Sequence, residues 1–181
     1  MNVKRIAVAG LVAAGVVASG TVLASPASAD TTSYLPGSGN WPVLRQGQTS
    51  ENVRALQWFL SCEGYDQPAP SHFGPKTRAN VHAFQQRYLT SQDGNVGAHT
   101  WRALLTTHTA PVGYGQRNNC VKGLQVLLNK WRYSDDLPIS GYHGPRTKKK
   151  LIRFQSGHGL PATGTVDLRT YQKLTYTPAG K

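Results

Sequence analysis

Cysteine, acidic residues and long apolar runs are all scarce in this chain of 181 residues. Two cysteines are too few for a small fold held by a framework of several disulfides. Beyond residues 6–23, no stretch is apolar enough to cross a membrane, which excludes a protein with several spans. From the length we expect one or two domains and no large multi-domain enzyme, and a hydrophobic content of 39% excludes a disordered polymer.

The residue patterns of common catalytic sites are also missing. There is no Gly-x-Ser-x-Gly sequence, no phosphate-binding loop and no Cys/His/Asn signature. The six histidines include no His-x-x-x-His pair, and Asp135-Asp136 is the one adjacent pair of acids. A zinc hydrolase or a glycosidase depends on such ligands and carboxylates. We therefore expect no enzymatic activity, no cofactor and no metal site.

The first 29 residues have the pattern of a secretory signal peptide. A basic start precedes the apolar residues 6–23, and Ala27-Ser28-Ala29 forms a small-x-small cleavage site. A transmembrane anchor is the alternative, but this segment is rich in Gly and Ala and has no second basic flank. We expect cleavage before Asp30 and a secreted product that has no contact with a membrane afterwards.

Export changes the interpretation of Cys62 and Cys120. Outside the cytosol, two lone cysteines usually pair. Closing a loop of this span stabilises a fold by about 4 kcal/mol in the chain-entropy model. A reactive thiol is the alternative, and it would need a nearby base and a reducing environment. The sequence favours a disulfide.

The rest of the chain contains two tandem copies of one sequence unit. The second copy follows the first at an offset of 68 residues before a Gly-Pro motif and 70 residues after it. We name residues 43–105 repeat 1 and residues 112–175 repeat 2. Repeat 1 contains Val53-Arg54-Ala55-Leu56-Gln57, Phe73-Gly74-Pro75-Lys76-Thr77, Phe84-Gln85 and Asp93-Gly94-Asn95-Val96. Repeat 2 contains Val121-Lys122-Gly123-Leu124-Gln125, His143-Gly144-Pro145-Arg146-Thr147, Phe154-Gln155 and Thr163-Gly164-Thr165-Val166.

Each repeat is predicted to form three short helices, so the fold class is all-α with two tandem three-helix repeats. Apolar residues at helical spacing predict the first helix over 51–61 and 120–130. Pro75 and Pro145 suit the first position of the second helix, and the third helix is brief. Flanking segments are predicted as a flexible lead (30–42), a linker (106–111) and a tail (176–181). Val96 and Val166 are expected to pair locally as extended residues. Four repeated glutamines are expected to form hydrogen bonds with turn backbone: Gln57, Gln85, Gln125 and Gln155.

The ordered set of motifs resembles the bacterial peptidoglycan-binding domain family. Repeat 1 matches the family pattern closely, whereas repeat 2 departs from it at several positions. Repeat 2 has Tyr142-His143 before its Gly-Pro, Thr163 for the Asp of Asp-Gly, and Tyr171 for the Trp. The resemblance implies a small three-helix fold that attaches to the bacterial cell wall without catalysis. Such modules usually accompany amidases, carboxypeptidases or other wall hydrolases.

The Gly-Pro turns are the candidate ligand sites. The start of a helix presents unpaired N–H groups and a positive dipole end, which favour an anion. Cations lie beside both turns, and the stem peptides of peptidoglycan end in carboxylates. The alternative is that each turn only begins a helix and that Phe73 only fills the core. The candidate ligand-binding residues are Phe73, Gly74, Lys76, Arg78, Tyr142, His143, Gly144, Arg146 and Lys148.

Positive charge is concentrated in the second half of the chain. Residues 30–110 carry six basic and five acidic residues, a net charge of +1, whereas residues 111–181 carry twelve and three, a net charge of +9. We expect repeat 1 to supply specificity for peptidoglycan and repeat 2, with its run Lys148-Lys149-Lys150, to add adhesion to teichoic acid or another wall polyanion. Two linked sites raise avidity by roughly 10²–10⁴ when both bind together.

Other functions stay open as alternatives to wall binding. A secreted inhibitor or assembly partner of a wall hydrolase fits the same composition, and a wall hydrolase itself is less favoured. Nucleic acid is not an expected partner because no nucleic-acid-reading motif is present. The expected location is extracellular or cell-wall associated.

Overall fold

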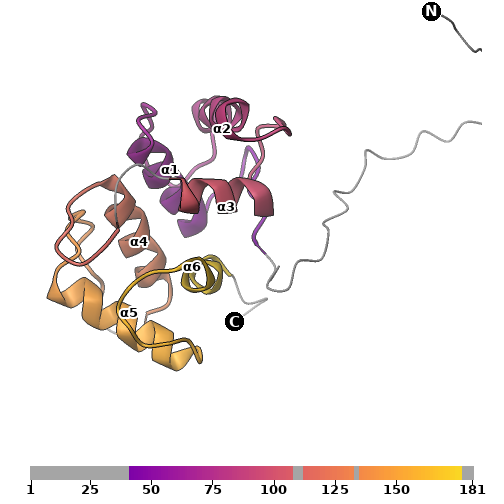
Figure 1. Cartoon of the computed structure of the whole chain (residues 1–181). Coiled ribbons are helices and arrows are strands. Elements are labelled where there is room, and N and C mark those ends of the chain that lie inside the picture. Colours follow the sequence, from indigo (N-terminus) through magenta and orange to yellow (C-terminus); the bar gives the residue numbers. More distant parts are fainter. Residues whose placement is uncertain (1–40, 108–111, 133–134, 177–181) are drawn as a thin grey trace, which may run out of the picture. The chain divides into compact units, whose positions relative to one another are not determined.

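The computed structural model describes residues 41–107, 112–132 and 135–176, and within these ranges the chain forms six helices joined by turns (Figure 1). The predicted signal peptide, nearly all of the lead, most of the linker and all but one residue of the tail lie outside the described residues. The prediction of three helices per repeat is confirmed. The helices are α1 (Glu51–Cys62), α2 (Pro75–Tyr88), α3 (Ala98–Thr106), α4 (Asn119–Lys130), α5 (Pro145–Gly157) and α6 (Leu168–Thr175).

The helices begin where the local sequence dictates. Ser50 and Asn118 precede α1 and α4, and each side chain accepts a hydrogen bond from the N–H three residues later. Proline occupies the first position of α2 and of α5. Asp167 caps α6 through a 2.7 Å bond from the N–H of Thr170, as its sequence position predicts. Gly97 precedes α3 and offers no side-chain cap.

Buried glutamines fix the turns of both repeats in the same way. The Nε2 group of Gln57 donates to the carbonyl of His72 at 2.8 Å and to the Thr77 hydroxyl at 3.1 Å, and its Oε1 accepts from the N–H of Ser71. Gln125 repeats these three bonds in repeat 2. Gln85 and Gln155 hold the later turns by the same pattern. The prediction for the four glutamines is confirmed.

The two repeats share one core, in which α1 packs against α4. Gly123 on α4 permits this approach, since a Cβ there would lie 2.8 Å from the ring of Phe59. Phe59 also meets Tyr171 of α6 edge to face, at 5.7 Å between ring centroids. The predicted disulfide is present, with a Cα–Cα distance of 5.3 Å between Cys62 and Cys120. The repeats are therefore joined by packing and by a covalent bond.

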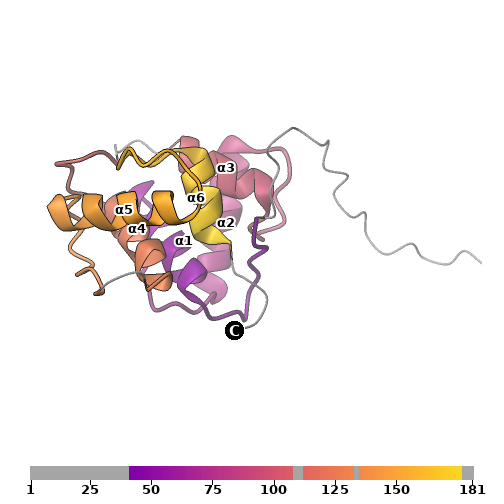
Figure 2. The same ribbon diagram turned by 90° about the horizontal axis from the view of Figure 1, so that it is seen from below.

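Polar contacts reinforce the same junction at its other end. The Nζ of Lys130 donates to the Asn52 side chain at 2.9 Å and to the carbonyls of Thr175 and Tyr176. The Asn52 amide also donates to the carbonyl of Thr175 at 2.8 Å. Burial lowers the pKa of Lys130 to about 7, against a smaller opposing effect of Glu51. Helix α6 also contacts α3, and the two lie side by side in both ribbon views (Figures 1 and 2).

The repeats differ in one backbone pairing. In repeat 1, Leu44 and Val96 form an antiparallel bridge with two 2.9 Å hydrogen bonds. The equivalent residues of repeat 2 are Val112 and Val166, and no bridge joins them in the described structure. The carbonyl of Val112 instead accepts from Nδ1 of His143 at 3.1 Å. The expectation of a local extended pair is therefore confirmed for Val96 and wrong for Val166, because a side chain has taken the acceptor.

No helix within the described ranges combines the length and the apolar character that crossing a bilayer requires.

Candidate functional site

At the Gly-Pro turn of repeat 1, the predicted aromatic residue is buried, whereas both predicted cations, Lys76 and Arg78, are exposed. Phe73 is completely buried, so its ring has no exposed face for a sugar or a peptide. Gly74 is the N-cap of α2. The Nζ of Lys76 lies 2.6 Å from the Asp66 carboxylate, which neutralises that cation. Of the predicted cations in repeat 1, Arg78 is the one that makes no ion pair within the described residues.

The turn of repeat 2 places its aromatic residues differently. The ring of Tyr142 packs over Gly144, where a Cβ would lie 2.5 Å from a ring carbon. The guanidinium of Arg117 covers the ring at 4.8 Å from its centroid, and Tyr142 stays 37% exposed. His143, by contrast, is completely buried and has no face open to a ligand. Arg146 follows at the start of α5, exposed and without an ion-pair partner in the described part of the chain.

His143 has a defined tautomer because of its one hydrogen bond. Since the carbonyl of Val112 can only accept, Nδ1 carries the proton and Nε2 is an unprotonated acceptor. Nε2 is buried and has no hydrogen-bond partner among the described residues. Burial lowers the pKa of His143, the hydrogen bond to Val112 opposes this, and the nearby Lys148 lowers it further. The side chain is therefore neutral at physiological pH.

Glycine turns position the equivalent cations Arg78 and Lys148. Gly94 and Gly164 adopt positive φ angles of 71° and 69°, and each turn is held by a buried glutamine. A Cβ at Gly94 would lie 2.9 Å from the side chain of Arg78, and a Cβ at Gly164 would lie 2.9 Å from that of Lys148. The aliphatic stems therefore rest on the turns, which leaves each charged end at the surface.

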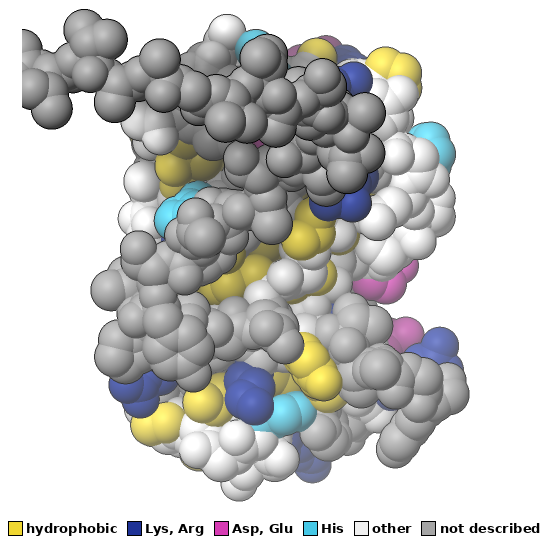
Figure 3. All heavy atoms as spheres, turned by 90° about the vertical axis from the view of Figure 1, so that its right-hand side faces the viewer, with side chains coloured by type: hydrophobic (Ala, Val, Ile, Leu, Met, Phe, Trp, Pro, Cys, Tyr) yellow, Lys and Arg dark blue, Asp and Glu magenta, His cyan; other side chains and the backbone are white. Residues whose placement is uncertain are grey.

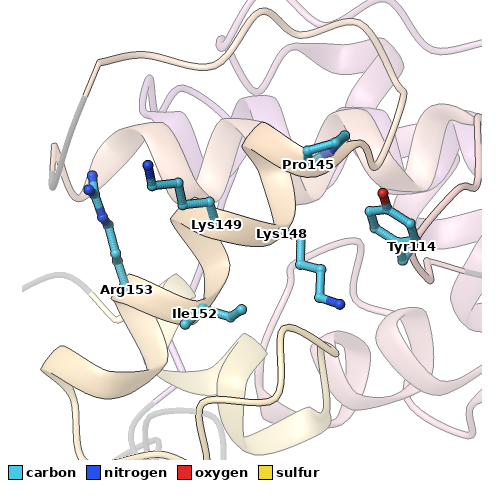
Figure 4. A pocket seen from close by; sticks show the side chains of 6 residues that line it. All are labelled: Tyr114, Pro145, Lys148, Lys149, Ile152 and Arg153. Carbon is cyan, nitrogen blue, oxygen red and sulfur yellow. The ribbon is translucent and has the colours of Figure 1, made fainter.

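The side chain of Lys148 lines a pocket of about 530 Å³ along α5 (Figure 4). Lys148 faces Tyr114, with its Nζ 5.1 Å from the ring centroid, and Ile152 lies on the same side of the helix. Lys149 and Arg153 project from the other side. Tyr114 is 56% exposed and is held near α5 by a bond from the N–H of Gly115 to the carbonyl of His143. We name Tyr114, Pro145, Lys148, Lys149, Ile152 and Arg153 the α5 pocket.

The sequence analysis placed one residue of the α5 pocket, Lys148, in the candidate site. Lys149 and Arg153 are four residues apart, and this helical spacing is a signal that was available but was not used. Tyr114 lies outside the helix, so its position depends on tertiary contacts. The space-filling view in Figure 3 shows separate Lys and Arg side chains next to hydrophobic ones on one face of the molecule.

The third lysine of the basic run has a structural role. Lys150 is 2% exposed, and its Nζ donates to the Asn129 side chain and to the carbonyl of Asp135. The carboxylate of Asp136 lies 3.7 Å away. Burial lowers the pKa of Lys150, while Asp136 and Asp135 oppose that effect. The expectation that the whole run Lys148-Lys149-Lys150 adds adhesion therefore needs correction, because Lys150 points into the fold while Lys149 is exposed.

Within the described ranges, no three His, Cys, Asp or Glu side chains are grouped closely enough to hold a metal ion.

Comparison with known proteins assigns both repeats to one family. The model of the family described as "Putative peptidoglycan binding domain" matches residues 49–104 and 117–174. The chain is 30% identical over 174 residues to a Bacillus licheniformis protein named "Probable N-acetylmuramoyl-L-alanine amidase", and 28% identical over 179 residues to the N-acetylmuramoyl-L-alanine amidase CwlL of that organism. Each match covers 83% of this chain and 49% of the amidase.

An uncharacterized protein of Kitasatospora aureofaciens is 41% identical over 105 residues, which are 55% of this chain and 86% of that protein. The chain thus spans about half the length of the two amidases that it matches. With both repeats matched by the family model, the chain belongs to the peptidoglycan-binding domain family, of which it carries two copies in tandem.

Proposed function

We propose that this protein binds bacterial cell-wall peptidoglycan without cleaving it, and that it acts outside the cytoplasm after removal of residues 1–29. The match of both repeats to the peptidoglycan-binding domain family carries this proposal. The disulfide supports an oxidising location. The boundaries that we propose for the two binding units are residues 43–105 and 112–175.

Repeat 2 is the stronger electrostatic binder in this proposal. Three cations line its α5 pocket: Lys148 faces the exposed ring of Tyr114, and Lys149 and Arg153 project from the other side of the helix. A carboxylate of a stem peptide, or a phosphate of teichoic acid, would accept hydrogen bonds from Lys148, Lys149 or Arg153. Tyr114 and Ile152 would cover the apolar part of the same ligand. The Gly144 N-terminus of α5 adds a positive dipole end beside Arg146.

Repeat 1 has a different surface at the equivalent positions. In place of Tyr114, Lys149 and Arg153 it has Gln46, Ala79 and Ala83, and Arg78 takes the position of Lys148. With Lys76 paired to Asp66, repeat 1 presents little net charge at its turn. We propose that repeat 1 recognises peptidoglycan by shape and hydrogen bonding, so its binding depends weakly on salt.

Co-sedimentation with purified sacculi tests this proposal. The secreted chain is incubated with intact sacculi and with sacculi stripped of teichoic acid, at low and at high salt. Retention on stripped sacculi at high salt is expected, with additional binding at low salt. Absence of pelleting under every condition would refute wall binding and leave a protein partner as the first candidate. Release of soluble muropeptides during the incubation would refute the non-catalytic role.

A matched pair of variants locates the electrostatic site. Lys149→Gln with Arg153→Gln removes two cations from the α5 pocket, and Arg45→Gln with Arg87→Gln removes two from repeat 1. Each lost contact with an anion at an exposed site is worth about 0.5–1 kcal/mol, so low-salt affinity should fall about tenfold in the first variant. Equal losses in the two variants would show that net charge, and not the pocket, governs adhesion.

A further inference from the structure

A second cavity, of about 250 Å³, lies where the two repeats meet. Leu105 at the end of α3 and Leu168 at the start of α6 line it, together with Tyr171. Two loop segments form its edges, residues 112–113 on one edge and residues 165–167 on the other. We name this cavity the junction slot. Its lining is largely apolar, and no cation lines it within the described ranges.

The junction slot lies at a position where the described part of repeat 2 lacks the backbone bridge of repeat 1. In repeat 1, Leu44 and Val96 are joined by the bridge, and Trp41 stacks on Trp101 beside it at 6.3 Å between ring centroids. In repeat 2 the His143 side chain occupies the carbonyl of Val112, and Val166 forms no backbone hydrogen bond with any described residue. Among the described residues, the N–H and C=O of Val166 thus have no backbone partner at the edge of the slot. Such groups form hydrogen bonds with an added extended segment.

A buried hydroxyl lines the same slot and also lacks a partner. Tyr171 is 2% exposed, and its hydroxyl makes no hydrogen bond in the described structure. The equivalent residue of repeat 1 is Trp101, whose Nε1 donates to the carbonyl of Pro42 at 2.9 Å. Burial of an unpaired hydroxyl is unfavourable, so native structures nearly always satisfy it. A ligand carbonyl in the slot would supply the acceptor that repeat 1 obtains from its own chain.

We propose that the junction slot binds a short extended peptide with small side chains, which pairs with the backbone of Val166 and accepts a hydrogen bond from Tyr171. This inference rests on the proposed function and assigns the stem peptide, and not the glycan, as the part of the wall that meets repeat 2 here. The volume of the slot leaves no room for long side chains, and Leu105 and Leu168 suit methyl groups.

Charge separates this site from the α5 pocket. The carboxylate of Asp167 lies at the slot, where it already caps α6. A negative group in the ligand would be repelled there, whereas a neutral peptide segment or one bearing an amine would not. A free peptide carboxylate is therefore expected to prefer the cations of the α5 pocket, and an internal peptide segment the junction slot.

The test is an NMR titration of the full secreted chain with N-acetyl-trialanine amide, a neutral extended peptide. The amide signals of Val166 and Gly113 are expected to shift, while those of Lys149 and Arg153 stay in place. Gly113→Val adds a branched side chain at a residue that lines the slot, and it does so without a clash, because a Cβ there meets no atom within 4 Å. Arg45→Val changes the equivalent position of repeat 1 and is the matched control.

At least tenfold weaker binding is expected for Gly113→Val and none for Arg45→Val. Tyr171→Phe gives a second readout, with about fivefold weaker binding expected because the hydroxyl donor is removed. Unchanged titrations in both Gly113→Val and Tyr171→Phe would overturn the proposal, as would peptide shifts confined to the α5 pocket. If Gly113→Val does not fold, Tyr171→Phe decides the outcome.

Sacculus co-sedimentation separates this inference from the proposed function. Peptide binding in the slot without retention on sacculi would refute wall binding and leave the slot as a peptide site. Retention on sacculi without any peptide titration would refute the slot and leave wall binding intact.

Discussion

Repeat 1 and repeat 2 have the same helices and the same buried glutamines, yet they use their surfaces differently. Lys76 is paired with Asp66, whereas its equivalent Arg146 has no ion pair among the described residues. Further along the same helix, Ala79 and Ala83 of repeat 1 correspond to Lys149 and Arg153 of repeat 2. Because internal hydrogen bonds fix the turns, a surface of this fold can change its charge without disturbing the helix positions.

The repeats also differ in how tightly the chain before the first helix is attached. Repeat 1 holds it by the bridge from Leu44 to Val96 and by the indole of Trp101. Repeat 2 relies on His143, and the space left open is the junction slot. The same unit thus has a backbone bridge in repeat 1 and a cavity at the equivalent residues of repeat 2. The following predictions test this difference in terms of the free energy of unfolding, from the largest expected effect to the smallest.

Loss of the disulfide should have the largest effect. Replacing Cys62 and Cys120 by alanine removes a constraint on a loop with a sequence separation of 58 residues. The free energy of unfolding should fall by about 4 kcal/mol. Chemical denaturation of the two forms measures this. If the repeats then unfold in two separate transitions, the disulfide and not the shared core couples them; a single transition shows the reverse.

Gly123→Ala should cause the next largest loss in the free energy of unfolding, because it disturbs the packing of α4 against α1. The added Cβ would lie 2.8 Å from the ring of Phe59, so α4 must move away from α1. Overpacking of this kind costs about 1–3 kcal/mol, which exceeds the gain of about 1 kcal/mol from replacing a helical glycine. Thermal unfolding checks the sign. Phe59→Leu in the same chain makes room and should recover part of the loss, whereas additive effects would contradict a direct clash.

Much of the fold follows from the sequence because local signals are repeated at a fixed offset. The caps at Ser50, Asn118 and Asp167 and the prolines at helix starts depend on residues that are near in the chain. The glutamine bonds join residues 9 to 22 positions apart, but they recur at the same places in both repeats. Each of these features occurs in a matching place in the other repeat, with exceptions such as Gly97. Agreement between two copies distinguishes a structural requirement from coincidence.

The features that the sequence analysis missed depend on contacts between distant segments. Tyr114 reaches α5 through the turn at His143, and Lys150 is buried by a loop that includes Asp135. The loss of the bridge at Val166 follows from a histidine that reaches the carbonyl of Val112. A residue count along the chain does not reveal which acceptor a buried side chain will take. Differences between the repeats were therefore harder to predict than their similarities.

Substitutions at the helix caps should have smaller effects, and they compare the start of α6 in repeat 2 with the start of α3 in repeat 1. Asp167→Ala removes the acceptor for the N–H of Thr170 and should lower the free energy of unfolding by about 1 kcal/mol. Gly97→Asp places the same cap on α3 and should raise it by a few tenths, roughly 0.3 kcal/mol. Chemical denaturation at neutral pH measures both. A loss of stability in Gly97→Asp would show that the two helix starts are not equivalent.

His143→Phe should lower the free energy of unfolding by less than about 1 kcal/mol at neutral pH, because Phe73 already fills the same place in repeat 1. One hydrogen bond to Val112 is lost, at a cost of about 1 kcal/mol, and a buried nitrogen without a partner is removed, which offsets part of that cost. The loss of stability in acid should differ more between the parent protein and the variant. The pKa of His143 is lowered by folding, so the unfolded chain takes up more protons, and the parent loses stability as the pH falls below about 6.5, the ordinary histidine value.

The phenylalanine variant should lose less stability over that acid range, as measured by denaturation at a series of pH values. Asp93, whose pKa is lowered through hydrogen bonds to Asn95 and Gln85 despite its burial, titrates at lower pH in both proteins and serves as an internal reference. The freed carbonyl of Val112 should then pair with Val166, as Leu44 pairs with Val96 in repeat 1. That bridge would close the junction slot, so the variant should also bind N-acetyl-trialanine amide more weakly. Unchanged peptide binding with a gain in acid stability would show that the slot does not depend on the histidine.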